Sequence, residues 1–278
     1  MARRLRIGVD VGGTNTDAAV MDGTRLLASS KQPTTADVES GVLASIGAVL
    51  ASAGVGPSDI ATVMIGTTHF TNALVQRRDL EPVGVLRIAL PAASAAPPLI
   101  DWPADLLDIV GRDTVMVRGG YQYDGRVNAP LDEAGVAEAA RAFRLRSINA
   151  VAVSALFAPV NDAMEQRAAD IIRNEHPDAH VTLSSRIGRI GMIERENAGV
   201  MNASLARLAM RTIAGFEKAL AASGLTAPLY ISQNDGTLMS AGAVREFPVL
   251  TFASGPTNSM RGAAYLSGLK DAIVVDIG

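Results

Sequence analysis

The sequence contains no cysteine in its 278 residues. This absence excludes a disulfide framework, a thiolate metal site and a cysteine nucleophile. It suits a reducing compartment, and we expect a cytoplasmic protein. Histidine is scarce too, with three residues. His176 and His180 have the spacing of a helical metal pair, but Pro177 lies between them and would break that helix, so this pattern does not indicate a metal site.

Long apolar runs and a strong net charge are also missing. The formal net charge is −3, which gives no electrostatic reason to expect nucleic acid as a partner. No window approaches the apolar length of a membrane-spanning helix. The arginines near the N-terminus are not followed by an apolar stretch of signal-peptide length. The composition therefore predicts neither a membrane nor a nucleic acid as a partner.

What the chain does have is ample material for a packed core. Hydrophobic residues make up 48% of the chain and charged residues 19%. Strand-like runs alternate with helical patterns, which is typical of a layered α/β fold. Residues 5–11, 16–22 and 24–32 have the pattern of three short strands joined by Gly-Gly and Asp-Gly turns. We therefore expect an antiparallel meander at the start of the fold.

Other segments have clear local patterns. Residues 36–54 have helical spacing, with Gly54 as the expected C-cap. Residues 91–112 are rich in proline and alanine and are predicted to form a surface excursion. Residues 193–222 are predicted to form one long helix. The last seven residues, AIVVDIG, are predicted to form a strand, and they repeat in shortened form the LRIGVDVGG of the beginning.

The first stretch that carries chemistry is GVDVGGTNTDAAV, residues 8–20. A strand ends near Asp10, and two glycines then make a tight turn in which backbone N–H groups can converge on an anion. Thr14 and Thr16 add hydroxyl donors, and Asp10 can hold Mg²⁺ through waters. A strand follows the glycines, so this is neither a dinucleotide fingerprint nor a Walker loop. The alternative is an ordinary Gly-Gly hairpin with polar neighbours.

A second stretch, residues 65–78, brings a buried strand to a helix start. It places Thr67, Thr68 and His69 where open α/β sheets bind ligands. The alternative is that the hydroxyl residues are ordinary helix caps and that His69 is a packed or capping histidine.

A third stretch, residues 250–268, contains a Ser-Gly-Pro turn at the expected start of a helix. Ser254, Gly255 and Pro256 form this turn, and proline is well suited to the first helical turn. Its functional interpretation is a helix N-terminus that faces a nucleotide. The alternative is simply a good helix start.

Taken together and in order, these stretches resemble the hydantoinase A/5-oxoprolinase family, which includes subunits of acetone carboxylase-type enzymes. The resemblance is carried by GVDVGGTNTD, GTTHFTNAL, ISQNDGTLMS and SGPTNSMRGAAYL. This family in turn resembles the actin-like, sugar-kinase and heat-shock ATPase superfamily. Those proteins have two ribonuclease H-like lobes, each opening with a phosphate hairpin, and they bind ATP between the lobes.

The resemblance implies a fold and its division. It implies an α/β, ribonuclease H-like lobe with a mixed sheet and flanking helices over residues 1–190. Residues 191–278 would hold a connecting helix and the beginning of a second lobe that breaks off inside its phosphate loop. Asp276 and Gly278 would begin this second loop. As an expectation, the chain is thus one nearly complete lobe and the opening of the next.

The resemblance also implies the residues of the site. ATP and Mg²⁺ are the implied cofactors, with Asp10 and Asp276 at the metal and with Asp10 and His69 as catalytic residues. The implied ATP-binding residues are Gly12, Gly13, Thr14, Asn15, Thr16, Thr67, Thr68, Ser254, Gly255, Pro256, Asp276 and Gly278. The chain departs from the family pattern at Thr257, Asn258 and Ser259, where the family often has small residues, and at Asp235, which replaces a glycine.

The implied activity is ATP-dependent opening of a cyclic amide such as a hydantoin, oxoproline or another lactam. ATP would phosphorylate the amide oxygen, and water would then attack the activated carbon. A partner subunit of hydantoinase type, a homo-oligomer, or both are expected. Two alternatives stay open, namely a carboxylase subunit of the acetone carboxylase type and a non-catalytic nucleotide-binding subunit.

Overall fold

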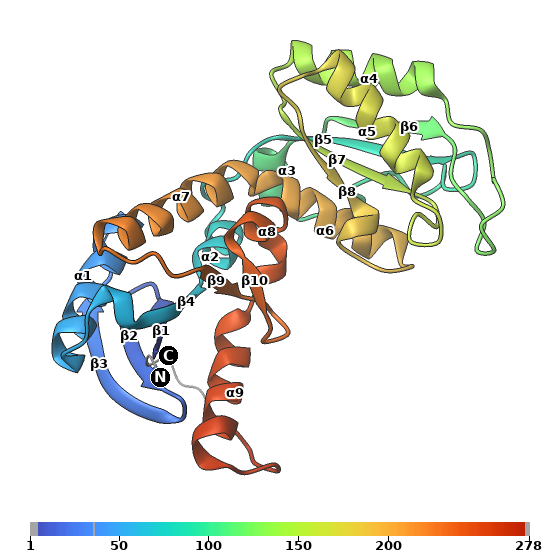
Figure 1. Ribbon diagram of the computed structural model, residues 1–278. Coiled ribbons are helices and arrows are strands. Elements are labelled where there is room, and N and C mark those ends of the chain that lie inside the picture. Colours follow the sequence, from blue (N-terminus) through green and yellow to red (C-terminus); the bar gives the residue numbers. More distant parts are fainter. Residues whose placement is uncertain (1–4, 36, 276–278) are drawn as a thin grey trace. The chain divides into compact units, whose positions relative to one another are not determined.

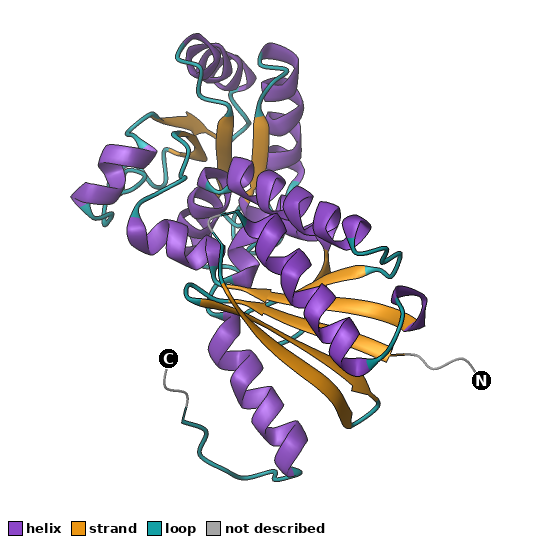
Figure 2. Ribbon diagram, turned by 90° about the vertical axis from the view of Figure 1, so that its left-hand side faces the viewer, coloured by secondary structure: helices purple, strands orange, loops and turns teal. Residues whose placement is uncertain are grey.

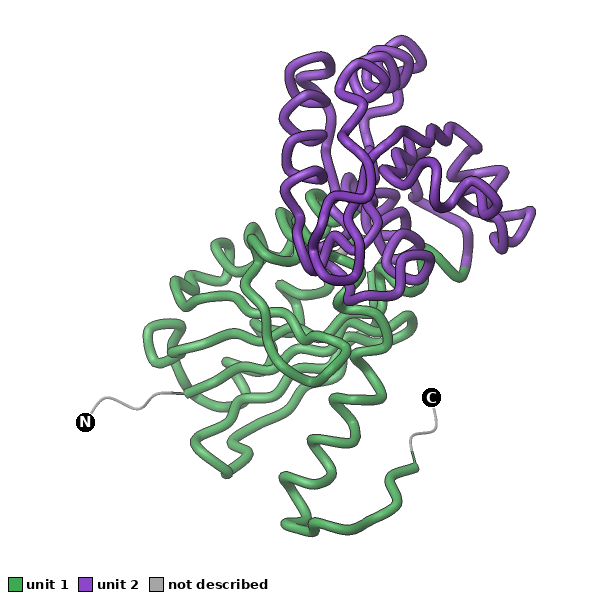
Figure 3. Tube along the Cα trace, turned by 90° about the vertical axis from the view of Figure 1, so that its right-hand side faces the viewer, with its two compact units in different colours: residues 1–75, 208–278 green, residues 76–207 purple. Residues whose placement is uncertain are grey.

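The computed structural model describes residues 5–35 and 37–275. The chain forms two compact units, one made of Met1–Val75 with Leu208–Gly278 and the other of Gln76–Arg207 (Figure 3). We refer to them as unit 1 and unit 2. The expected division at residue 190 stays a prediction. Asp276 and Gly278 lie outside the described residues.

Unit 1 contains a mixed six-stranded sheet in the order β10-β9-β4-β1-β2-β3 (Figure 1). The first three strands form the predicted antiparallel meander, whereas β4 runs parallel to β1 and β9 parallel to β4. The predicted α/β class with a mixed sheet and flanking helices is therefore confirmed. The strands are β1 Leu5–Val11, β2 Asn15–Asp22, β3 Arg25–Pro33, β4 Ile60–Thr67, β9 Leu229–Ser232 and β10 Leu238–Ser240.

Helices cover both faces of this sheet. One face of β1 and β2 is apolar and packs on α1, while Asp10 points to the other face. α9, the helix that leads to the C-terminus, packs on β4 and lies below the sheet in Figure 2. The helices in or entering unit 1 are α1 Val38–Ala53, α2 His69–Gln76, α7 Ala206–Ala222, α8 Ala241–Glu246 and α9 Ser254–Ser267, with short 3₁₀ turns at Pro57–Asp59 and Pro248–Thr251.

The bounds of α1 follow from local chemistry. Asp37 accepts a hydrogen bond from the backbone N–H of Ser40 at 2.9 Å, which satisfies one free donor of the first turn. Gly54 ends the helix in the left-handed conformation, with φ 64°. A left-handed residue is the usual way to close a helix, and glycine adopts it without steric cost. The predicted C-cap is confirmed.

Unit 2 contains a parallel four-stranded sheet in the order β6-β5-β7-β8. Its apolar core lies between this sheet and helices α4 and α5. The elements are β5 Val83–Leu90, α3 Ala104–Val110, β6 Thr114–Arg118, α4 Glu133–Leu145, β7 Ala150–Ala155, α5 Ala163–Glu175, β8 His180–Leu183, a 3₁₀ turn at Ser184–Arg186 and α6 Met192–Ser204.

Two local predictions need correction. The segment predicted to be a surface excursion contains α3, whose Leu106, Leu107 and Val110 are buried. The predicted long helix is two helices, because α6 ends at Ser204 and α7 begins at Ala206. The hydroxyl of Ser204 donates to the carbonyl of Met201 at 2.8 Å, a local bond that competes with helical hydrogen bonding.

The predicted terminal strand is also wrong over the part that the structure describes. Residues 272–275 have no strand conformation, and Ile273 is 93% exposed. An apolar run becomes a strand only when another strand pairs with it. No described strand pairs with this one.

Candidate functional site

The turn between β1 and β2 is held from one side by Thr34. Its hydroxyl donates to the carbonyl of Gly12 at 2.9 Å, and its backbone N–H donates to the carbonyl of Thr14 at 2.9 Å. The N–H of Gly12 donates to the carbonyl of Asn15 at 3.0 Å. Gly13 and Thr14 are exposed at the tip of the turn. The hairpin is therefore fixed from behind, with its tip open to solvent.

The two glycines of this turn differ in how much space surrounds them. A Cβ atom on Gly12 would lie 3.0 Å from the carbonyl oxygen of Asn15, which is tight. A Cβ atom on Gly13 would have no atom within 4 Å, and Gly13 does not have a positive φ. The fold itself therefore does not require glycine at position 13. Free space at an exposed backbone turn is what a phosphate needs in order to reach N–H groups.

Thr16 lies on the other face of β2. It pairs with Val11, and its side chain is fully buried toward α1. Its hydroxyl is 3.1 Å from that of Thr34, and its carbonyl accepts a hydrogen bond from the hydroxyl of Ser45 at 3.1 Å. The structure thus keeps the Thr16 side chain away from the Asp10 face. It supports the turn through Thr34.

Asp10 is exposed and stands beside the end of β4. It pairs in register with Gly66 of that strand. A Cβ atom on Gly66 would lie 3.1 Å from Oδ1 of Asp10 and 3.2 Å from Nδ2 of Asn258 on α9. The structure therefore brings Asp10, the β4 end and α9 together. Asn258 is a site residue that sequence reasoning treated only as a departure from a family pattern.

The predicted residues after β4 mostly serve the start of α2. The hydroxyl of Thr67 accepts from the backbone N–H of His69 at 3.2 Å and lies 2.7 Å from its Nδ1. Thr68 donates its N–H to the carbonyl of Val11 at 3.4 Å, which ties this segment to the end of β1. Burial, with the charge of Arg211, lowers the pKa of His69 below its ordinary value. His69 is therefore neutral at pH 7.

The Ser-Gly-Pro segment begins α9, with Pro256 in its first turn as predicted. Ser254 is buried, whereas a Cβ atom on Gly255 would meet no atom within 4 Å. The preceding Ala253 has a left-handed φ of 55°, which is unusual for a residue other than glycine. Its N–H donates to the hydroxyl of Thr71 at 3.4 Å. The segment is thereby anchored next to α2.

Asp235 has a structural role in the turn between β9 and β10. Its carboxylate accepts hydrogen bonds from the N–H and the hydroxyl of Thr237, at 2.8 and 2.7 Å. The hydroxyl bond is the main cause of its lowered pKa. An aspartate that bonds the residue two positions on is a common turn stabiliser. These bonds give Asp235 a structural role that needs no ligand.

Unit 2 contains two buried charged clusters that sequence reasoning did not assign. In the first, Glu196 accepts hydrogen bonds from Arg87 at 2.7 and 2.5 Å and from Ser154 at 2.6 Å. In the second, Glu165 accepts from the hydroxyl of Ser184 at 2.5 Å, and Ser184 accepts from Arg195 at 2.8 Å. All these side chains are at most 1% exposed. The clusters join strands to helices in the interior of unit 2.

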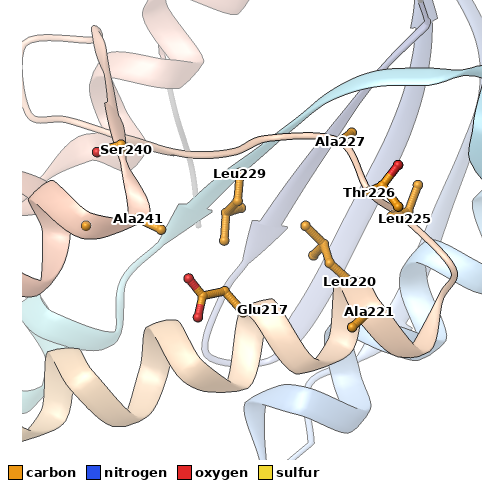
Figure 4. Close-up of a pocket in the computed structure, with 10 residues that line it drawn as sticks. Glu217, Leu220, Ala221, Leu225, Thr226, Ala227, Leu229, Ser240 and Ala241 are labelled. Carbon is orange, nitrogen blue, oxygen red and sulfur yellow. The ribbon is translucent and has the colours of Figure 1, made fainter.

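A hollow of about 370 Å³ lies elsewhere on unit 1 (Figure 4). It is bounded by α7 on one side and by the start of β9 and the β10–α8 corner on the other. Leu229 marks the amino end of β9, whereas Asp10 and Gly66 lie near the carboxyl ends of their strands. The hollow therefore does not belong to the Asp10 site.

The donor set around Asp10 restricts the metal that could bind. Among the described residues, no three His, Asp or Glu side chains are grouped in a way that could hold a metal ion. A metal at Asp10 would take its remaining ligands from water and from phosphate oxygens. Mg²⁺ fits this environment, because it keeps several waters and often uses one or two carboxylates. No helix in the described part of the chain has the length and hydropathy to cross a membrane.

Comparison with known proteins decides the family. A family model described as the hydantoinase/oxoprolinase N-terminal region matches residues 6–176, and one described as hydantoinase/oxoprolinase matches residues 195–278. The chain belongs to the hydantoinase/oxoprolinase family. This confirms the resemblance carried by the four sequence stretches. The first match ends just after α5, and the second begins inside α6.

Similar proteins include one subunit of a carboxylase and one subunit of a caprolactamase. The acetophenone carboxylase gamma subunit of Aromatoleum aromaticum is 29% identical over 98% of this chain, and the caprolactamase subunit alpha of Pseudomonas jessenii is 27% identical over 99%. The structure of the ATP-dependent caprolactamase from Pseudomonas jessenii has a TM-score of 0.74 at 25% identity over 95% of this chain and 40% of its own.

A nucleotide-free acetone carboxylase has the same fold, with a TM-score of 0.78 at 22% identity over 96% of this chain and 41% of its own. The chain covers 41% and 42% of the two curated relatives named above. The hydantoinase/oxoprolinase chain described here is therefore less than half as long as these relatives.

Proposed function

We propose that this chain supplies an ATP-binding lobe to an enzyme that uses ATP to open a cyclic amide ring. One observation carries the proposal. An exposed carboxylate, Asp10, stands at a strand end beside a turn whose Gly13 the fold itself does not require. The likeness to a caprolactamase subunit supports the amide substrate class.

Each residue of the turn would have a distinct task. Asp10 holds Mg²⁺ through waters, and the backbone N–H groups of the turn from Gly12 to Asn15 donate to phosphate oxygens. Thr14 adds a hydroxyl donor at the exposed tip. Thr16 acts from behind, through its contact with Thr34. These groups are held in place before the nucleotide arrives, which is how electrostatic stabilisation of a transferring phosphoryl group is achieved.

ATP, when bound, would supply the phosphoryl group that activates the amide carbon by bonding to the amide oxygen. Water would then add to that carbon, the ring carbon–nitrogen bond would break with the nitrogen leaving as the protonated amine, and a second water would release the phosphate. Ser254, Gly255 and Pro256 would face the nucleotide from α9, and Asp276 and Gly278 would begin a second phosphate loop. Thr67 and Thr68 would line the site near the end of β4. His69, neutral at pH 7, can accept or donate one proton near this strand end.

The test is substrate-dependent phosphate release by the complete natural protein together with its partner subunit. Phosphate release that depends on a hydantoin, oxoproline or another lactam supports the proposal. No release with any of these substrates, with or without the partner, contradicts it.

A carboxylase is the second candidate, since the acetophenone carboxylase gamma subunit is similarly close, at 29% identity. Phosphate release that needs a ketone with bicarbonate, and not a cyclic amide, would favour it. A non-catalytic nucleotide-binding subunit is the third candidate. Asp10→Ala would then leave the activity of the assembled complex unchanged. A homo-oligomer or a complex with a hydantoinase-type partner fits each candidate.

A further inference from the structure

The Asp10 carboxylate and the side-chain amide of Asn258 lie next to each other at Gly66, although Asn258 is far from Asp10 in the sequence. Oδ1 of Asp10 and Nδ2 of Asn258 would lie 3.1 and 3.2 Å from a Cβ atom on Gly66. Gly66 is itself buried and has no side chain to separate them. An acceptor-only group and a group with N–H donors therefore flank the same point at the end of β4.

α9 holds Asn258 in this place through its neighbouring residues. The hydroxyl of Thr257 donates to the carbonyl of Asn234 at 2.8 Å. Arg261, one turn further on, lies against Gly236, where an added Cβ atom would come within 2.3 Å of its Cδ. Residues four apart share a helix face, so Thr257 and Arg261 bind α9 to the β9–β10 turn. At the other end of α9, Tyr265 donates to the carbonyl of Gly23 at 3.2 Å.

These anchors hold α9 in place, and the side-chain amide of Asn258 lies beside Asp10. The side chain is half-buried, in contrast to the exposed Ser259 that follows it. An amide N–H can donate to an anion without adding charge. A terminal phosphate opposite a metal-bound carboxylate needs such donors, because charge builds up on its oxygens during transfer.

We propose that Asn258 distinguishes ATP from ADP, by donating a hydrogen bond from its side-chain amide to the terminal phosphate. The inference rests on the proposed function, since it names the part of the nucleotide that this site recognises, the terminal phosphate. Asn258 is thus a specificity-determining residue of this site.

The test is calorimetric binding of ADP and of a non-hydrolysable ATP analogue, with Mg²⁺, to the complete natural protein. In Asn258→Ala the affinity for the analogue should fall about tenfold, the size expected for one lost hydrogen bond to a charged group. The affinity for ADP should change less than about twofold. Ser259→Ala is the matched control and should leave both affinities unchanged.

Asn258→Asp is a second variant of nearly the same shape, and it keeps the test informative if the alanine variant folds poorly. It loses the donor and adds a negative charge, so it should weaken analogue binding at least as much as alanine does. An equal loss for both nucleotides, or a loss for neither, would overturn the inference and leave the proposed function standing. Failure of the wild type to bind the analogue would overturn both.

Discussion

At the Asp10 end of the unit 1 sheet, Asp10 and Thr14 are exposed, and a Cβ atom on Gly13 would meet no neighbouring atom. In the unit 2 sheet, Arg87, Ser154 and Glu196 are at most 1% exposed and hydrogen-bond to one another. Both sets of polar residues lie on or next to strands of an α/β layer, where ligand sites are common. The two sets differ in how buried their side chains are and in the hydrogen-bond partners that those side chains have. The polar residues of the unit 2 cluster already satisfy one another and hold the fold, whereas the exposed Asp10 can meet a ligand.

The largest effect should come from breaking the buried cluster of unit 2. Glu196→Ala leaves the Arg87 guanidinium buried without its carboxylate, so the free energy of unfolding should fall by about 3–5 kcal/mol. Urea denaturation measures this loss. The control is Glu133→Ala, because Glu133 pairs with Arg167 on the surface and should hardly change the midpoint. Equal midpoints for the two variants would contradict the structural role of the cluster.

The next effect should come from the exposed carboxylate of unit 1. Asp10→Asn keeps the shape but removes the charge that would hold Mg²⁺, so affinity for Mg²⁺–ATP should fall on the order of a hundredfold, or about 2.7 kcal/mol. Calorimetry measures the affinity, and the urea midpoint should stay the same. Asp17→Asn is the control. Asp17 stands opposite Asp10 in the β1–β2 ladder, but its carboxylate pairs with Lys31 at 3.6 Å. Unchanged nucleotide affinity in Asp10→Asn would argue against the site.

A glycine from each unit sharpens the comparison further. Gly13→Ala should keep stability within about 0.5 kcal/mol, because its Cβ atom meets nothing in the fold. It should still lower nucleotide affinity about tenfold, by filling the space at the turn. Gly84→Ala should instead lower stability by about 1–3 kcal/mol and leave nucleotide affinity unchanged, because its Cβ atom would lie 2.8 Å from the ring of Phe143. Melting curves measure the stability of both variants, and calorimetry measures their nucleotide affinity.

The smallest effect concerns pH and His69. Burial lowers the pKa of His69, with help from the charge of Arg211, so the unfolded chain binds this proton at a higher pH than the folded one. The stabilising contribution is complete above the ordinary value of 6.5 and is lost as pH falls through the lower pKa of the folded state.

In His69→Gln, stability should therefore decline less on acidification than in the wild type, as measured by urea midpoints below pH 6.5. His180→Gln is the control, because His180 is exposed at the start of β8. A wild-type acid decline in His69→Gln would show that other groups cause it.

Much of the fold could be predicted from local sequence. The meander, α1 with its Gly54 cap and the first-turn Pro256 depend on neighbouring residues, and the structure confirms them. No prediction covered β5, whose apolar run contains Arg87. A charge inside a strand is explained only by its partner, and Glu196 lies 109 positions away along the chain.

The candidate site divides in the same way. The Asp10 turn could be predicted because its glycines and hydroxyl residues are contiguous. The convergence of Asp10 with Asn258 could not be predicted, because it depends on the pairing of β1 with β4 and on the anchoring of α9. Thr16 shows the converse, since it belongs to the right motif but its side chain points to the buried face.

The sequence by itself determined the family, the α/β class and the glycine turn after Asp10, because these depend on residues close together in the chain. The tertiary structure alone decided which polar groups reach solvent and which are buried and hydrogen-bonded to one another in the core. The physical reason is that strand register and helix packing set the face on which each side chain lies, and both depend on contacts between distant segments.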